Sequence, residues 1–372
     1  MENREKDFKE ITECLRANNY AKSQIIPTEK NYWKLPLEPL NFLNFVLWKK
    51  NALFEWTAFP ALYQKIFKMR YPQTFILFKI FFLNNDMKRE DLSGFFNEED
   101  INSFINNDIL KESNGNYKFN IKLIPYKDMI LSKGTSWFGK DSVIFAEHLA
   151  KDLNGIVLDN TLDLCTGTGI QAMVSKKYSK NVIASDIRER SIQNAMLNAK
   201  INNLEDITFL TSDLLGNVSG RYDLITANPP YGIVSKNPDD KTYGLHTVFG
   251  LIENLDNYLN NAGMAIIITE SVVKDGKDMV SEKIKQVFSN KDYTIVLKPL
   301  NYHINKPHFE LVHKEYGISH IPLYIITFRK NGNRMIVSLR LSLVKKMVCF
   351  AYIALMYFRF FLRCKSDGIP TK

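Results

Sequence analysis

The sequence predicts a doubly wound α/β domain that follows a mostly helical, winged-helix-like domain. Three observations lead to this fold class. Short apolar runs alternate with helically spaced apolar residues from 156 to 328. The first run leads into a turn that contains Gly167 and Gly169, and the second run ends in Asp186. Glycines between a strand and a helix, with an acid after the next strand, are typical of a nucleotide-binding βαβ unit.

The elements of the α/β part follow from these apolar patterns. In the helix after the glycine turn, for example, Ile170, Met173 and Val174 recur at helical spacing. Strands that alternate with helices favour parallel pairing. Strands are expected at 156–164, 181–185, 207–210, 222–227, 265–269, 294–297 and 323–328, and helices at 143–153, 170–178, 188–201, after the loop 232–241 up to residue 260, and at 279–288.

The N-terminal part has a different pattern. Helices are expected at 7–16, 75–83, 91–96 and 99–110, and a strongly apolar stretch covers 35–48. Residues 112–125 alternate around Ser113-Asn114-Gly115, which predicts a hairpin. Helices followed by a hairpin are the order of a winged-helix module. Because no basic recognition helix is visible, packing or presentation of a substrate is favoured over DNA binding.

We therefore expect three regions: an N-terminal domain over 1–132, an α/β domain over 133–330 and a tail over 331–372. Between the domains, Trp137 and Phe138 lie in a turn-rich segment and can either stack near a ligand or pack as a linker. The tail contains an apolar run, 347–362, that is short for a membrane span. Basic residues flank it, so weak membrane association through 334–365, docking on the body and a dispensable appendage all remain open.

Charge and cysteine content restrict the function classes. The chain has a formal charge of +9, but residues 331–372 carry eight basic residues and one acid, so the rest is close to neutral. The overall charge therefore gives no support for nucleic-acid binding by the body. The four cysteines are scattered, and no apolar signal core follows Met1, which favours a cytoplasmic protein. We expect a monomer.

A metal site is not expected. Four of the six histidines fall in one segment, at His303, His308, His313 and His320. Their spacing is uneven and no cysteine lies near them, which is unlike the ligand spacing of zinc sites. Loop packing, or a lid over a bound acceptor, explains the segment better.

The most specific motif is Asn228-Pro229-Pro230-Tyr231, which directly follows the predicted strand 222–227. The Asn228 side-chain oxygen and the Pro229 carbonyl can each accept a hydrogen bond from a planar NH2 group. Tyr231 can stack on the plane of the same group. An ordinary turn is the alternative, because Asn-Pro and Pro-Pro are common in loops.

The glycine turn alone is ambiguous. Gly167-x-Gly169-x-x-Ala172 also fits the dinucleotide fingerprint, so a nicotinamide-dependent oxidoreductase has to be considered. Two features argue against it. Asp163 places a carboxylate before the turn, where it would repel a pyrophosphate but suit a sulfonium and an amino group. The motif that begins at Asn228 has no evident task in hydride transfer.

From Asp163 to Tyr231 the chain resembles the class I S-adenosylmethionine-dependent methyltransferases, which have a Rossmann-like sheet. It is most similar to the release-factor and ribosomal-protein glutamine N-methyltransferases and the ribosomal RNA guanine N2-methyltransferases. The resemblance rests on the order of four motifs and extends over about 140–330. They are 163–169, Asp186, 212–214 and 228–231. Cys165 stands where many members have glycine.

The resemblance implies a role for each motif. The turn with Asp163, Cys165, Gly167 and Gly169 would line the methionine end of S-adenosylmethionine. Asp186 would hold the ribose, and Asp213 would accept a hydrogen bond from the adenine amino group. Asn228, Pro229 and Tyr231 would orient the nitrogen that receives the methyl group. The alternatives are a helix N-cap for Asp186, which does not exclude a ribose contact, and a cap at the end of the strand 207–210 for Asp213.

We therefore expect an enzyme that transfers a methyl group from S-adenosylmethionine to a planar amide or amino nitrogen. By the resemblance, the first expected acceptor is a protein glutamine of the translation apparatus, in a release factor or a ribosomal protein. The alternative is a nucleic-acid base, at adenine N6 or guanine N2, since these present the same planar NH2. A small-molecule acceptor and a DNA-binding regulator rank below both.

Overall fold

A computed structural model describes nine ranges of the chain: 2–20, 25–26, 54–55, 68–69, 71–134, 136–204, 206–231, 242–300 and 316–330. All of them belong to one unit, Met1–Val337. Four sequence predictions concern residues outside these ranges. They are the apolar stretch 35–48, the loop 232–241, the histidines His303, His308 and His313, and the tail 331–372.

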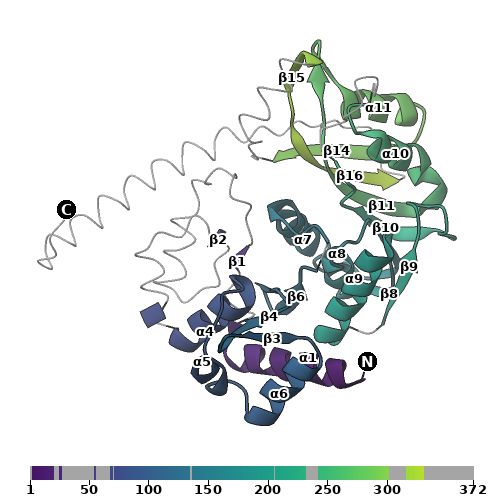
Figure 1. Cartoon of the computed structure of the whole chain (residues 1–372). Helices are drawn as coiled ribbons and strands as arrows, with labels where there is room; N and C mark the ends of the chain where they lie inside the picture. Colours follow the sequence, from purple (N-terminus) through teal and green to yellow (C-terminus); the bar gives the residue numbers. More distant parts are fainter. Residues whose placement is uncertain are drawn as a thin grey trace, which may run out of the picture. The chain divides into compact units, whose positions relative to one another are not determined.

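The centre of the described structure is a seven-stranded sheet with the order β14-β16-β11-β10-β7-β8-β9 (Figure 1). Strands β11, β10, β7, β8 and β9 pair in parallel, while β16 is antiparallel to both of its neighbours. The predicted doubly wound fold class is confirmed. The strands are β7 (Leu158–Leu164), β8 (Ser179–Asp186), β9 (Ile207–Thr211), β10 (Tyr222–Ala227), β11 (Leu259–Glu270), β14 (Tyr293–Leu300) and β16 (Leu323–Lys330).

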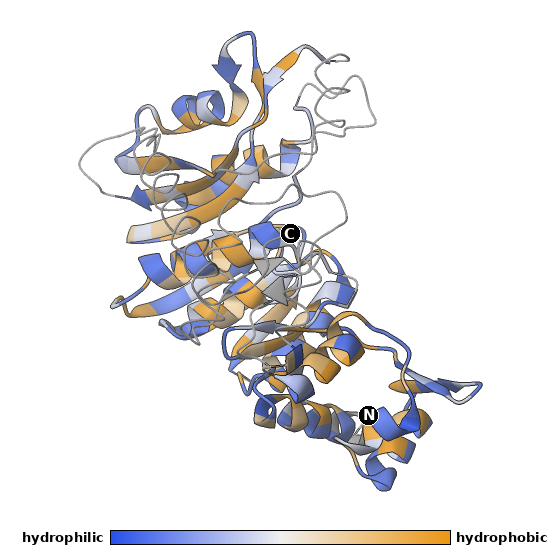
Figure 2. Ribbon diagram, turned by 90° about the vertical axis from the view of Figure 1, so that its left-hand side faces the viewer, coloured by the Kyte–Doolittle hydropathy of each residue, from blue (hydrophilic) through white to orange (hydrophobic). Residues whose placement is uncertain are grey.

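Helices cover both faces of the sheet because its strands are apolar on both sides. Along β11, Ile266 and Ile268 belong to one hydrophobic core, while Ala265 and Ile267 belong to the other. Such strands form nearly continuous apolar runs (Figure 2). The first core includes α7 (Lys140–Asp152), α8 (Ile170–Lys176) and α9 (Glu189–Ile201), and the second includes α10 (His246–Tyr258) and α11 (Met279–Phe288).

The N-terminal part is mostly helical and ends in two hairpins. The predicted hairpin is confirmed, and its turn residues Asn114 and Gly115 both have positive φ, as a type I′ turn requires. The helix expected at 99–110 ends earlier, because Leu110 already starts a strand. The elements are α1 (Glu2–Ala17), β1 (Ile25–Ile26), β2 (Phe54–Glu55), α4 (Pro72–Leu77), the π-helix η3 (Phe78–Phe82), α5 (Arg89–Ser93), α6 (Glu98–Asn106), β3 (Leu110–Ser113), β4 (Asn116–Phe119), β5 (Leu123–Tyr126) and β6 (Met129–Ser132).

Polar contacts join this part to the sheet. Three asparagines spaced four residues apart, Asn194 and Asn198 of α9 and Asn202 directly after it, bind backbone groups of β6 and the residue after it. In α1, the Arg16 guanidinium donates to the Ile201 carbonyl at the end of α9, over 2.9 Å. These hydrogen bonds fix the position of β6 beside α9. The assignment of residues 1–132 as a separate substrate-presenting domain stays a prediction.

Three short strands extend the α/β part beyond the predicted elements. They are β12 (Val273–Lys274), β13 (Lys277–Asp278) and β15 (Ile318–His320), and they pair in the order β13-β12-β15. Strands of two or three residues are too short to show a periodic pattern, so they could not be predicted from the sequence. The last of the clustered histidines, His320, is the final residue of β15 and is exposed.

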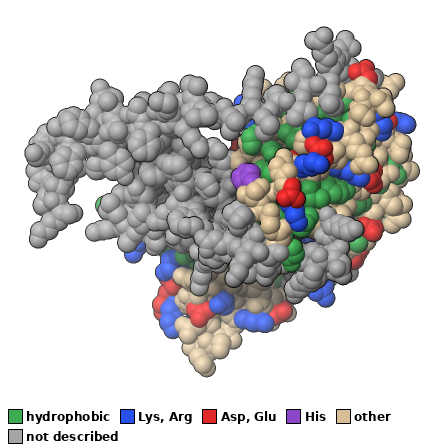
Figure 3. All heavy atoms as spheres, turned by 90° about the horizontal axis from the view of Figure 1, so that it is seen from above, with side chains coloured by type: hydrophobic (Ala, Val, Ile, Leu, Met, Phe, Trp, Pro, Cys, Tyr) green, Lys and Arg blue, Asp and Glu red, His purple; other side chains and the backbone are tan. Residues whose placement is uncertain are grey.

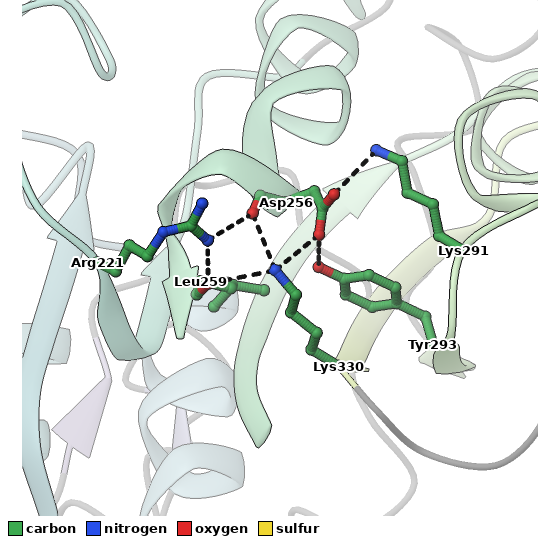
Figure 4. A network of polar contacts seen from close by, with 6 residues as sticks. All are labelled: Arg221, Asp256, Leu259, Lys291, Tyr293 and Lys330. Carbon is green, nitrogen blue, oxygen red and sulfur yellow. Dashed lines mark hydrogen bonds and ion pairs between the residues drawn. The ribbon is translucent and has the colours of Figure 1, made fainter. Parts of the chain in front are cut away.

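A charged network stabilises the sheet at the end of α10 (Figure 4). The Asp256 carboxylate accepts from the Tyr293 hydroxyl at 2.7 Å and pairs with Lys330 at 2.9 Å and Lys291 at 3.4 Å. The Arg221 guanidinium donates to the Asp256 and Leu259 carbonyls. Hydrogen bonds from Lys330 and Tyr293, with the charge of Lys291, lower the pKa of Asp256 to about 2 although burial opposes this. The network lies at the amino ends of β10 and β11.

The surface shows no segregation of charge on the face drawn in Figure 3. There, the Lys and Arg side chains of the described residues are interspersed with Asp and Glu. In the described ranges, no group of three or more His, Cys, Asp and Glu residues could hold a metal ion. No described helix is both long and apolar enough to cross a membrane.

Candidate active site

The predicted site residues lie at the carboxyl ends of β7, β8, β9 and β10. The strand order reverses between β7 and β10, because β7 is followed by β8 on one side while β10 lies on the other. In open α/β sheets, ligands bind outside the carboxyl ends of the strands at such a switch point. Asp163 is near the end of β7, Asp186 ends β8, and Asn228 follows β10.

Asp163 is buried beneath the glycine turn, with only 1% of its surface exposed. Its carboxylate accepts hydrogen bonds from the hydroxyls of Thr166 and Thr226, each at 2.6 Å. Burial raises its pKa to about 7, although these hydroxyls and the backbone N–H of Ala172 counteract the shift. Asp163 therefore ties the turn to both β10 and the start of α8.

The turn itself needs residues without a Cβ. Gly167 and Gly169 have φ values of 56° and 81°, in the left-handed region that favours glycine. A Cβ on Gly169 would also lie 3.1 Å from the Cβ of Ala195, so α9 approaches the turn closely. Cys165 shares the left-handed conformation, with φ 56°, at the position where the resemblance expects glycine.

Asp186 reaches the same turn from the neighbouring strand. Its carboxylate accepts from the backbone N–H of Gly167 and of Arg188, each at 3.0 Å. The next residue, Ile187, is 60% exposed although it is apolar. An exposed apolar side chain beside a carboxylate at a strand end suits a ligand with a polar part and a flat apolar part.

Four predicted residues share one electrostatic environment. Burial raises the pKa of the Cys165 thiol to about 12, and Asp186, Asp163 and Asp213 raise it further in that order. Asp213 is exposed just beyond β9, and Ser212 before it bonds to the Asp186 carbonyl at 3.0 Å. The structure therefore brings Asp163, Cys165, Asp186 and Asp213 together around the turn.

The segment before α7 covers the turn. The Ser136 hydroxyl donates to the Gly167 carbonyl at 3.3 Å, and the Trp137 carbonyl is the atom that a Cβ on Gly167 would meet first. Phe138 is buried in the first hydrophobic core, whereas Trp137 is 44% exposed. Of the two aromatic residues, Trp137 is the one available to a ligand.

Asn228 and Tyr231 converge on a residue that the sequence reading missed. The Asp141 carboxylate accepts from the Tyr231 hydroxyl at 2.9 Å and from the Asn228 side-chain amide at 3.3 Å. It also accepts from the Trp137 indole N–H at 2.9 Å. Asp141 is the second residue of α7, where an acid is ordinarily explained by the helix dipole, so its sequence position alone did not single it out.

A second missed carboxyl group is Glu270, the last residue of β11. Burial raises its pKa to about 7, and the charge of Asp141 adds to the shift. An acid at the carboxyl end of a strand is the same signal that identified Asp186, so the sequence contained this information.

Comparisons with known proteins agree with this geometry. The methyltransferase small domain family matches residues 135–302. A protein of Methanocaldococcus jannaschii, whose name provisionally assigns it to the protein N5-glutamine methyltransferases, is 31% identical over 157 residues. That match covers 39% of this chain and 76% of the relative. The chain belongs to the small-domain methyltransferases. Its cofactor is S-adenosylmethionine.

Other relatives of this methyltransferase match over a smaller share of their length. The release factor glutamine methyltransferase of Fusobacterium nucleatum is 26% identical, over 53% of this chain and 61% of the relative. The ribosomal protein L11 methyltransferase of Lactobacillus delbrueckii subsp. bulgaricus is 33% identical, over 37% of each chain. A solved ribosomal protein L11 methylase of the same organism has a TM-score of 0.36 at 24% identity, over 51% of this chain and 79% of that one.

The residues at the sheet edge fit the cofactor. Gly167 and Gly169 give the turn between β7 and α8 its left-handed backbone, which brings the chain round sharply at the carboxyl end of β7, where a cofactor would bind. The Asp186 carboxylate is directed to the same turn, where it can accept hydrogen bonds from hydroxyl groups.

Proposed function

We propose that this methyltransferase methylates the side-chain nitrogen of a glutamine in a protein of the translation apparatus. The observation that carries the proposal is the position of Asn228-Pro229-Pro230-Tyr231 directly after β10, beside the glycine turn that follows β7. The names of the relatives support the same acceptor, because they include protein glutamine and ribosomal protein methyltransferases. Such an acceptor would place the reaction in the cytoplasm.

We assign the cofactor contacts as follows. Asp186 holds the ribose hydroxyls, and the turn with Asp163, Cys165, Gly167 and Gly169 lines the methionine end. Asp213 accepts from the adenine amino group, and the exposed Ile187 contacts the adenine plane. Bound S-adenosylmethionine supplies an electrophilic methyl group.

The acceptor side uses Asn228, Pro229 and Tyr231. An amide nitrogen is a weak nucleophile because its lone pair is delocalised into the carbonyl group. Two hydrogen-bond acceptors, the Asn228 Oδ1 and the Pro229 carbonyl, hold both N–H groups and favour localisation of that lone pair. Tyr231 stacks on the plane of the amide. Orientation of this kind can lower a barrier by about 7–11 kcal/mol.

The test is transfer of a radiolabelled methyl group from S-adenosylmethionine into a lysate of cells that lack the gene. We expect the labelled macromolecule to be degraded by protease and not by nuclease. Complete enzymatic digestion, without acid hydrolysis, should release the label as N-methylglutamine. The Asn228→Ala variant should transfer at least about 100-fold less label, since lost positioning costs about that much. Its affinity for the cofactor should stay within about 2-fold.

The matched control is Asn254→Ala. Asn254 is an exposed residue of α10 whose side-chain amide donates to the Gly250 carbonyl within its own helix. This variant should transfer label at the wild-type rate. If nuclease degrades the labelled material, the methyl acceptor is instead a nucleic-acid base, at adenine N6 or guanine N2. No label in either fraction, with the cofactor bound, would refute a macromolecular acceptor.

A further inference from the structure

One buried carboxylate connects the residues that receive the acceptor. Asp141 is 4% exposed and lies 87 residues before Asn228 in the chain. Its Oδ2 accepts from both the Asn228 amide and the Tyr231 hydroxyl, and the Trp137 indole donates to both of its oxygens. Asp141 therefore contacts both ends of the 228–231 motif through a single side chain.

The chemistry of Asp141 decides which way the Asn228 amide faces. A carboxylate only accepts hydrogen bonds, so the amide must turn its NH2 group toward it. The Ser142 hydroxyl lies 3.5 Å from the same Nδ2 atom and can accept from it, but a hydroxyl can also donate, so the carboxylate of Asp141 decides the orientation. The carbonyl oxygen Oδ1 is then left on the other edge of the amide. Among the described residues, none donates a hydrogen bond to it.

The Asn228 Oδ1 atom is the one that must accept a hydrogen bond from the NH2 group of the methyl acceptor. If the Asn228 amide turned over, it would present N–H groups to the N–H groups of the acceptor, and no hydrogen bond could form. The bond from the Tyr231 hydroxyl to Asp141 likewise fixes the ring that follows the two prolines.

We propose that Asp141 is a positioning residue for methyl transfer: it holds the Asn228 amide with its oxygen toward the methyl acceptor and fixes the Tyr231 ring. The inference rests on the proposed function of the 228–231 motif, and it adds a residue from a different part of the chain. Asp141 touches neither the acceptor nor the methyl group. It acts through Asn228 and Tyr231.

The structure also explains why Asp141 stays in place. It is the second residue of α7, a helix of 13 residues, so the helix dipole favours its negative charge. The Trp137 indole closes on it from the segment that covers the glycine turn, with its Nε1 2.9 and 3.0 Å from the two oxygens. Asp141 therefore links the cover of the cofactor turn to the acceptor motif.

The test compares Asp141→Asn with Asp152→Asn, the same change at the last residue of the same helix. The asparagine has an N–H group of its own, so it no longer dictates the orientation of Asn228. We expect the maximal rate of label transfer into lysate to fall by about 10- to 100-fold in Asp141→Asn, with the KM and Kd for S-adenosylmethionine within about 2-fold. Asp152→Asn should behave like the wild type.

A double-mutant cycle separates positioning from a merely structural role. If Asp141 acts through Asn228 and Tyr231, Asp141→Asn should lower the rate by less than about 2-fold in a background that carries both Asn228→Ala and Tyr231→Phe, where neither contact to Asp141 remains. An independent role would instead give the full additional fall. The side-chain NH2 resonances of Asn228, identified by their loss in Asn228→Ala, should shift in Asp141→Asn and not in Asp152→Asn.

Each result has a defined meaning. Wild-type rate and unshifted Asn228 resonances in Asp141→Asn would overturn the inference while the proposed function stands. No transfer by the wild type would refute the proposed function instead. Should Asp141→Asn fail to bind the cofactor, Asp141→Ser, which keeps an acceptor for the start of the helix, is measured in its place with the same expectations.

Discussion

Asn198 of α9 pairs with Ser132 of β6 as a neighbouring strand would. Its Oδ1 accepts from the Ser132 backbone N–H at 2.6 Å, and its Nδ2 donates to the Ser132 carbonyl at 2.9 Å. The same Nδ2 donates to the Thr168 carbonyl in the glycine turn, also at 2.9 Å. One buried amide therefore connects the N-terminal part, α9 and the glycine turn.

Replacement of this amide should be costly. In Asn198→Ala, the Ser132 backbone N–H and the Thr168 carbonyl lose this partner, while the Ser132 carbonyl keeps its bond from Asn194. Each buried group left unsatisfied costs about 1–3 kcal/mol. We expect the free energy of unfolding to fall by about 2–4 kcal/mol in urea denaturation. The control Asn194→Ala, whose amide contacts carbonyls at 3.1 and 3.3 Å and is less buried, should cost about 1 kcal/mol. Equal losses in the two variants would contradict this account.

The glycine turn offers a test that separates backbone strain from close packing. Gly169 and Gly155 have nearly equal φ values, 81° and 82°, but only Gly169 has a neighbour within 4 Å of the position of a Cβ. Gly155→Ala should cost about 1–2 kcal/mol from the left-handed backbone alone. Gly169→Ala should cost more and should weaken cofactor binding in calorimetry. Equal stability and unchanged cofactor affinity would show that α9 yields to the added methyl group.

At position 165, glycine should give a more stable protein than alanine. At φ 56°, alanine keeps a left-handed strain of about 1–2 kcal/mol that glycine avoids. Thermal unfolding should therefore rank Cys165→Gly above Cys165→Ala by about 1 kcal/mol. Cys14, inside helix α1, is the control, because there glycine should be about 1 kcal/mol less stable than alanine. The same sign at both positions would be evidence against strain at Cys165.

Asp186 should govern affinity for the cofactor. If its carboxylate binds the ribose, Asp186→Asn removes a charged hydrogen bond worth about 1.5–3 kcal/mol, which corresponds to a 10- to 100-fold rise in Kd. The control is Asp159→Asn, since Asp159 lies at the amino end of β7 and pairs with Lys180 at the surface. Isothermal titration with S-adenosylmethionine measures both. A Kd that moves equally in the two variants would remove Asp186 from the ribose site.

Glu270 should make stability depend on pH. Its pKa is raised from 4.5 to about 7 by burial and by Asp141. The native state therefore holds a proton that the unfolded state releases, so the free energy of unfolding decreases as pH rises from about 4.5 to 7. Glu270→Gln lacks this titration, and its stability relative to wild type should increase by about 2 kcal/mol between pH 5 and pH 8.

The control for this titration is Glu282→Gln. The Lys285 side chain lowers the pKa of Glu282 on the surface of α11. Its contribution is present above the ordinary pKa of a glutamate and is lost as pH falls, so it should not change between pH 5 and pH 8. Urea denaturation at the two pH values measures both variants. A pH-independent difference for Glu270→Gln would mean that Glu270 is ionised throughout.

The backbone of the proposed cofactor site could be predicted because its signals are local. Strand β10 and helix α11 have the predicted bounds, since their apolar spacing decides burial directly. The glycines of the turn are required by their own backbone angles. Asp186 was singled out because it stands at the carboxyl end of a strand. In each case the physical cause lies within a few residues of the position that it explains.

The acceptor half needed the tertiary structure. The sequence determined that Asn228 and Tyr231 follow a buried strand, and hence which chemistry they can perform. Only the packing of α7 against the sheet brings Asp141 to them, across 87 and 90 residues of chain. The orientation of the Asn228 amide depends on that contact, because the two edges of an amide are equivalent in shape and differ only in which neighbour donates or accepts. The spacing of residues in the sequence does not predict which carboxylate the fold will place beside the Asn228 amide.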